Sequence, residues 1–137
     1  MWQPAGSLDA IDIASSGLAA ERKRMEVIAN NVANANTTRG SNEGEPFRRQ
    51  EVIFEAAMAS AGGGVRVTGV REDPSELPKL FKPTHPHADE AGFVTMPNVV
   101  VSNEMVDLMV ASRAYEANLS SIKSVEEATN SVIELLR

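Results

Sequence analysis

The side chains best suited to chemistry in this chain lie in one short stretch that contains both of its histidines. His85 and His87 alternate along the chain, and Asp89 and Glu90 follow closely. In an extended segment alternate residues point to the same side, so this spacing could present two imidazoles and a carboxylate to zinc. The same stretch, with a proline between the histidines and a glycine after the carboxylates, is also typical of a turn. Because the chain has no third histidine, we interpret it as a turn and expect no metal and no cofactor.

Other common catalytic patterns are absent from the sequence. It contains no Gly-x-Ser-x-Gly motif for a serine nucleophile. The run Gly62-Gly63-Gly64 lacks the Lys-Ser/Thr of a phosphate-binding loop and precedes an expected strand, so a turn is the better interpretation. With no cysteine, thiolate zinc sites and cysteine nucleophiles are excluded. We therefore predict that the protein is not an enzyme; the alternative in that class is a small metal-dependent enzyme.

Charge and hydropathy exclude two classes of partner. The 137 residues carry a net charge of −6, and no segment has the basic excess that binding to nucleic acid needs. No apolar run approaches the ~20 residues of a membrane span. Residues 1–6 lack a basic region followed by an apolar one, so we expect no cleavable secretory signal.

An N-terminal helix is predicted over about residues 7–35. Ser7 is suited to cap it, and the Asn-rich segment with Gly40 ends it. Apolar residues recur every seven positions, which is typical of a coiled-coil register. These positions are Ile11, Leu18, Met25 and Val32, with Ala14, Glu21, Ile28 and Ala35 between them.

A C-terminal helix carries the strongest periodicity and is predicted over residues 101–137. Its stripe alternates at spacings of four and three over five heptads. The stripe comprises Val101, Met105, Leu108, Ser112, Tyr115, Leu119, Ile122, Glu126, Thr129, Ile133 and Leu136. Glu104 and Asp107 favour the N-terminal end of this helix because they complement its dipole.

The central residues 37–100 form a different region, rich in glycine and proline. Strands are predicted over residues 47–54, 65–70 and 93–96, and residues 47–50 fit either an intersubunit contact or a solvated strand. The fold class is therefore mainly α with a small β insert. An N-terminal helical arm (residues 1–36) pairs antiparallel, in a coiled-coil-like manner, with the C-terminal helix (residues 101–137). A short, loop-rich β module (residues 37–100) lies between them.

The C-terminal helix also has a second apolar stripe, which one partner helix could not cover. It consists of Val106, Met109, Val110, Ala114, Val125 and Val132. Two helices with one narrow seam are marginally stable, so we hypothesise that neighbouring subunits bury the second face. The alternatives are an ordinary helical hairpin, or a binding module such as an export chaperone or coiled-coil adaptor.

Several stretches carry a resemblance to a known family. Residues 16–22 and 25–38 resemble the N-terminal signature of flagellar rod and hook proteins. Further segments resemble the FlgC family of proximal rod proteins of the bacterial flagellar basal body. They are residues 47–50, 85–89, 92–94, 96–99, 104–107 and 111–118.

The resemblance implies a structural subunit of the basal-body rod in the periplasmic space. Such a subunit would polymerise through its terminal helices with other copies and other rod proteins, transmit motor torque, and be exported by the flagellar type III apparatus. Together with the heptads, it predicts an assembly seam and motif. Their residues are Ile11, Leu18, Met25, Ile28, Asn30, Asn31, Val32, Asn34, Asn36, Met105, Leu108, Tyr115, Leu119, Ile122, Ile133 and Leu136.

Overall fold

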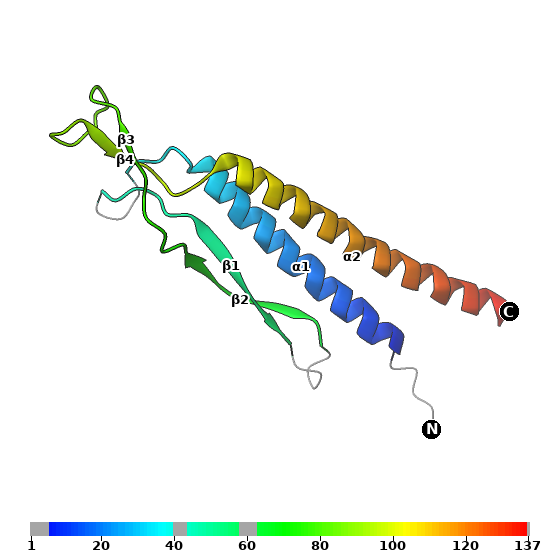
Figure 1. Ribbon diagram of the computed structural model, residues 1–137. Coiled ribbons are helices and arrows are strands. Elements are labelled where there is room, and N and C mark those ends of the chain that lie inside the picture. The colour runs from blue at the N-terminus through cyan, green and yellow to red at the C-terminus, as the bar shows by residue number, and fades with distance from the viewer. Residues whose placement is uncertain (1–5, 40–43, 58–62, 137) are drawn as a thin grey trace.

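Two long helices lie side by side and carry two small β hairpins. The computed structural model describes residues 6–39, 44–57 and 63–136, with side chains in the first helix from residue 10 onward. The elements follow the order α1 (Gly6–Ala33), β1 (Gln50–Ala56), β2 (Val65–Glu72), β3 (Lys79–Phe81), β4 (Phe93–Thr95) and α2 (Val101–Leu135). Figure 1 shows β1 and β2 alongside α1, and β3 and β4 beyond the far end of the helix pair. The predicted α fold with a β insert is confirmed at this level.

The helices run antiparallel. Asn31 of α1 meets the start of α2 at Glu104, whereas Gly17, earlier in α1, approaches Asn118, later in α2. Figure 1 accordingly places the start of α1 and the end of α2 at the same end of the molecule. α2, with 35 residues, is longer than α1, with 28, and continues past the first turn of α1.

Small and polar residues form the line along which the helices meet. In α2 the buried residues are Glu104 and Ala111, and in α1 they include Ala14 and Ala20. The predicted stripe of the C-terminal helix lies beside this line: Met105 and five other large members remain exposed. The difference has a steric reason, because short side chains allow two helix backbones to approach closely and larger ones are then displaced to the flanks.

The first helix differs from its prediction at both ends. It begins at Gly6, so Ser7 lies in its first turn instead of preceding it. It ends at Ala33 because Asn34 turns back on the helix, where its Nδ2 donates to the carbonyl of Asn30 at 2.9 Å.

The β module consists of two antiparallel, two-stranded sheets, β1–β2 and β3–β4. β1 pairs with β2 from Gln50 opposite Glu72 to Ala56 opposite Val65, with a register shift between Ile53 and Phe54. β1 begins three residues later than predicted, β2 extends two further, and β3 was not predicted. Val94 of β4 is buried, and Phe81 and Phe93 stack edge to face at 5.3 Å. Gly92, with φ of 82°, permits this contact.

The closeness of the helices is tested by enlarging Gly17. A Cβ at this position would lie 2.9 Å from Nδ2 of Asn118, so Gly17→Leu should separate the helices and lower the free energy of unfolding by about 1–3 kcal/mol. Urea unfolding followed by circular dichroism measures the loss. In the double variant with Asn118→Ala, which removes the clashing amide, part of the loss should be restored; an equal loss with and without Asn118 would contradict close packing here.

Candidate functional site

A buried polar junction connects both helices to the first β hairpin. The side chain of Asn31 is completely buried and Glu104 is only 1% exposed. Nδ2 of Asn31 donates to Oε2 of Glu104 at 2.9 Å and to the carbonyl of Gln50 at 2.9 Å. Oδ1 of Asn31 accepts from the backbone N–H of Gln50, also at 2.9 Å. The Asn31 amide thus bonds to β1 as a neighbouring strand would, while also holding the first turn of α2.

Arg49 completes this junction from the residue before β1. Its Nε donates to Oε1 of Glu104 at 2.5 Å, and its Nη1 lies 2.5 Å from a carboxylate oxygen of Glu51. Asp73 and Asp107 lie farther away, at 3.7 Å and 3.5 Å. One guanidinium therefore faces four carboxylates, one of which is buried and depends on it for charge compensation.

The segment before α2 is joined to the same point. Oδ1 of Asn98 accepts from the backbone N–H of Arg49 at 2.7 Å, and its Nδ2 donates to Oγ of Ser75 at 2.8 Å. The junction therefore fixes the exit of α1, the start of β1, the loop after β2 and the entry to α2.

Hydrogen bonds and charges at the junction shift the pKa values of Arg49, Glu51 and Asp73. Burial lowers the pKa of Arg49, but its hydrogen bonds and charge interactions with Glu104 and Glu51 outweigh this effect, so that its pKa is raised. The hydrogen bond from Arg71, supported by Arg49, holds the pKa of Glu51 below its ordinary value. The backbone N–H of Ser75 lowers the pKa of Asp73 in the same way.

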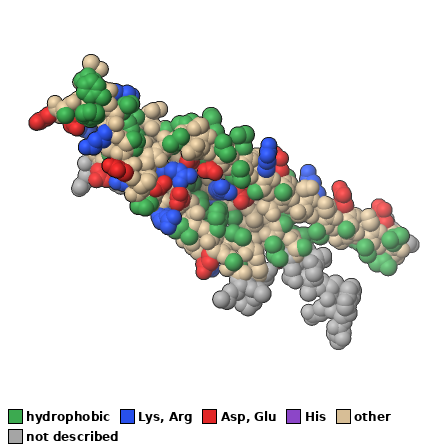
Figure 2. Space-filling view, viewed as in Figure 1, with side chains coloured by type: hydrophobic (Ala, Val, Ile, Leu, Met, Phe, Trp, Pro, Cys, Tyr) green, Lys and Arg blue, Asp and Glu red, His purple; other side chains and the backbone are tan. Residues whose placement is uncertain are grey.

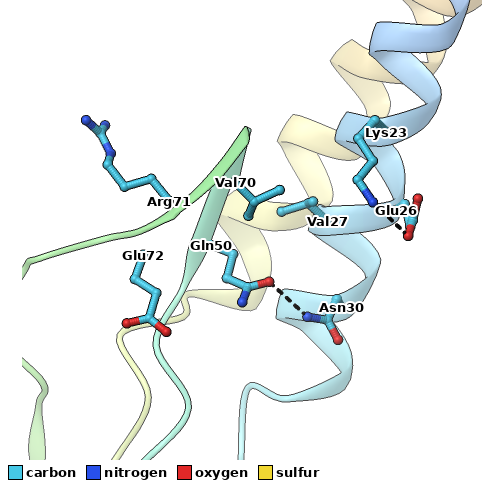
Figure 3. Close-up of a pocket in the computed structure, with 8 residues that line it drawn as sticks. All are labelled: Lys23, Glu26, Val27, Asn30, Gln50, Val70, Arg71 and Glu72. Carbon is cyan, nitrogen blue, oxygen red and sulfur yellow. Dashed lines mark hydrogen bonds and ion pairs between the residues drawn. The ribbon is translucent and has the colours of Figure 1, made fainter. Parts of the chain in front are cut away.

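Open grooves flank the hairpin where it crosses the helices. Figure 3 shows one of about 430 Å³, in which Val27 and Val70 point toward each other. Lys23 pairs with Glu26 at 3.0 Å on its helical wall, and Asn30 donates to Gln50 at 3.2 Å in its floor. The polar side chains of this groove are paired with one another or exposed to solvent. The groove is therefore the surface between the hairpin and α1, with no arrangement of groups that suggests catalysis.

The histidine stretch is a hydrogen-bonded turn. Nδ1 of His85 accepts from the backbone N–H of His87 at 3.1 Å, and Nδ1 of His87 lies 2.8 Å from Oγ1 of Thr38. Asp89 accepts from the N–H groups of Ala91 and Phe93. Burial lowers the pKa of His87, with help from the charge of Arg39. Among the described residues, no cluster of three or more potential metal ligands occurs.

Exposed hydrophobic residues concentrate on α2. Of twenty large hydrophobic side chains that are exposed in the described parts of the chain, ten belong to this helix. The ten residues of α2 are Val101, Met105, Val106, Leu108, Met109, Val110, Leu119, Val132, Ile133 and Leu135. Figure 2 shows hydrophobic side chains grouped along the upper edge of the molecule, over the first part of α2. No described helix is both long and apolar enough to cross a membrane.

The residues predicted for the assembly seam fall into three groups. Only Ile28 and Asn31 are buried. Half-buried positions along the helix pair are Ile11, Leu18, Met25, Val32, Asn34, Tyr115 and Ile122. Exposed positions are Asn30, Asn36, Met105, Leu108, Leu119, Ile133 and Leu136. Sequence reasoning did not identify Arg49 and Glu104 as partners, because residues 55 positions apart leave no local pattern.

Comparison with known proteins gives one consistent family. A model described as "Flagella basal body rod protein" matches residues 11–39, and one described as "Flagellar basal body rod FlgEFG protein C-terminal" matches residues 90–135. The flagellar basal-body rod protein FlgC of Borreliella burgdorferi is 38% identical over 96% of this chain and 99% of its own length. FlgC of Salmonella typhimurium is 44% identical over 87% of this chain and 90% of its own. FlgC of Bacillus subtilis is 32% identical, covering 91% and 95%.

The dependence of the junction on Glu104 is tested by neutralising it. Glu104→Gln keeps an acceptor for Asn31 but removes the charge opposite Arg49, so the free energy of unfolding should fall by about 2–3 kcal/mol. This expected loss of stability is smaller than for a fully buried ion pair, because the Arg49 side chain is 22% exposed and lies beside other carboxylates. Chemical denaturation measures the change. The exposed Glu126→Gln should alter stability by less than about 0.5 kcal/mol; equal effects of the two substitutions would contradict a special role for Glu104.

The lowered pKa values of Glu51 and Asp73 predict a loss of stability in acid. Both groups bind protons more weakly in the folded chain than in the unfolded one, so protonation favours unfolding. Their contribution is complete above their ordinary pKa values of 4.5 and 3.8 and is lost as the pH falls through the lower folded values. The urea midpoint should therefore decrease below about pH 5. Glu51→Gln should weaken this dependence, whereas Glu127→Gln, at an exposed site, should leave it unchanged.

Proposed function

The chain belongs to the FlgC family of flagellar basal-body rod proteins, and from this membership we propose that it polymerises through its helix pair into the shaft that transmits motor torque. Membership in the family makes it a structural protein of the basal-body rod and not an enzyme. Its partners in the shaft are other copies of itself and other rod proteins. It reaches the periplasmic space through the flagellar type III export apparatus.

The observation that supports polymerisation most directly is the exposed apolar surface of α2. A helix packed only within its own chain turns its large hydrophobic residues inward. Here the inward line includes Glu104 and Ala111, while Met109 remains 56% exposed. Exposed apolar area of this extent on a helix is typical of an interaction surface. The assembly seam consists, in this proposal, of the exposed and half-buried seam residues together with the Asn-rich end of α1.

Torque transmission requires that the parts of each subunit do not move independently. The junction of Asn31, Arg49 and Glu104 satisfies this requirement because one network of hydrogen bonds holds both helices and the β1–β2 hairpin. Load applied to the hairpin would pass directly into the helix pair.

Placing a charge on the exposed face tests the proposal. Met109→Glu should leave the fold intact, because the side chain projects into solvent, but it should abolish swimming and remove the protein from isolated basal bodies. Burying a carboxylate in an apolar contact costs several kcal/mol, which exceeds the about 1.5–3 kcal/mol that the Met side chain contributes.

The matched control is Ser120→Glu, which introduces the same charge at another exposed position of α2. Its cells should swim. Circular dichroism of both purified variants checks that each is folded. Normal swimming of cells with Met109→Glu, with the variant present in their basal bodies, would contradict the proposal.

A further inference from the structure

The β3–β4 hairpin and the turn within it, residues 79–95, form a distal lobe with few links to the rest of the chain. Neither β3 nor β4 contacts a described helix, or a described strand other than its partner. Figure 1 shows the lobe beyond the far end of the helix pair. Two loops, residues 73–78 and 96–100, lead into and out of it. The orientation of the lobe therefore depends on the contacts that its turn makes.

One hydrogen bond, which we call the latch, joins this turn to the segment after α1. Nδ1 of His87 lies 2.8 Å from Oγ1 of Thr38. In the described parts of the chain, no other hydrogen bond links residues 79–95 to a residue outside 78–96. The two segments also border an open pocket of about 180 Å³, so the packing between them is incomplete.

The position of His87 depends on the protonation state of His85. The backbone N–H of His87 donates to Nδ1 of His85 at 3.1 Å. A ring nitrogen accepts a hydrogen bond only when it carries no proton. A proton on Nδ1 of His85 would bring two donors together and free the turn that holds His87 beside Thr38. The two imidazole rings lie 5.3 Å apart, so two positive charges here would also repel each other.

The charged groups around the latch oppose a proton on His87. Arg39 and Asp89 line the same pocket as His87. Burial lowers the pKa of His87, and the charges of Arg39 and His85 add to this effect. The carboxylate of Asp89 would favour a proton, but it already accepts from two backbone N–H groups of its own turn. The latched form therefore binds protons more weakly than an open form.

We propose that the latch is sensitive to pH: it holds the distal lobe at neutral pH and releases it in acid. This inference goes beyond the proposed polymerisation and does not depend on it. Because the latched form binds protons more weakly, a fall in pH favours opening. The effect is absent well above the ordinary histidine pKa of 6.5 and increases as the pH falls below that value. The released lobe pivots on its two loops while the helix pair stays intact.

The distance between two spin labels tests the proposal, because the chain has no cysteine of its own. Labels on Ala91→Cys and Ser102→Cys, both at exposed positions, report the lobe relative to the start of α2. Double electron–electron resonance should give a narrow distance distribution at about pH 7.5 and a broad one at about pH 5.5. Circular dichroism at both pH values checks that the helices are intact.

Two further variants of the labelled chain separate the latch from other effects of acid. Thr38→Val removes the hydroxyl at nearly constant size and should give the broad distribution at both pH values. The double variant His85→Asn, His87→Gln should stay narrow at both. An Asn side chain accepts from the N–H two residues further on, and a Gln amide bonds to Thr38 without titrating.

The matched control is Thr129→Val, the same substitution at an exposed position of α2. It should leave the distribution narrow at about pH 7.5 and broad at about pH 5.5, as in the chain with its own threonine. A narrow distribution in acid for the chain with both histidines would overturn the proposal. So would a narrow distribution for folded Thr38→Val, or broadening of the double histidine variant in acid.

Discussion

The contact between Asn31 and Glu104 determines how the rest of the molecule is arranged. It places a fully buried amide and a buried carboxylate at the point where α1 ends and α2 begins, and leaves neither without a partner. Such groups are costly to bury unless every hydrogen bond is made, so the arrangement tolerates few alternatives. Asn31 aligns β1, Glu104 requires Arg49, and Arg49 brings the acidic residues of the neighbouring loop and strand to the same place.

This contact also explains why the apolar residues of α2 are on its surface. Once Glu104 faces α1, the helical repeat brings Ala111 and Asn118 to the same side and turns Met105 and Met109 away. Small residues make up much of the core: four of the seven buried hydrophobic residues of the described chain are alanine. Ten large hydrophobic side chains of α2 are therefore exposed, and these are the residues that the proposed polymerisation would bury.

Local patterns predicted most of the elements but not the contacts between them. Heptad spacing identified both helices, and β-type runs identified β1, β2 and β4 within a few residues. β3 was not predicted because its three residues, which lie between Pro78 and Pro83, are too few to show a periodic pattern. Apart from the family resemblance, Glu104 was interpreted through the dipole of α2, and the segment of Arg49 as a solvated strand or an intersubunit contact. Periodicity shows that a helix has an apolar face; it does not show whether that face meets its own chain or another molecule.

The overhang of α2 beyond α1 has a consequence for when growth begins. Its last residues, 126–136, are exposed throughout, so packing against α1 adds little to the stability of this end. The last four carbonyl groups of a helix have no partners within it, so this end is the part of α2 that frays most easily, and ordering the backbone costs about 1–2 kcal/mol per residue. A first encounter between two free molecules must meet that cost from a small contact, whereas the end of an existing shaft offers a larger one. In the assembly proposed above, this cost would slow nucleation relative to elongation, so that polymer would form where a template already stands.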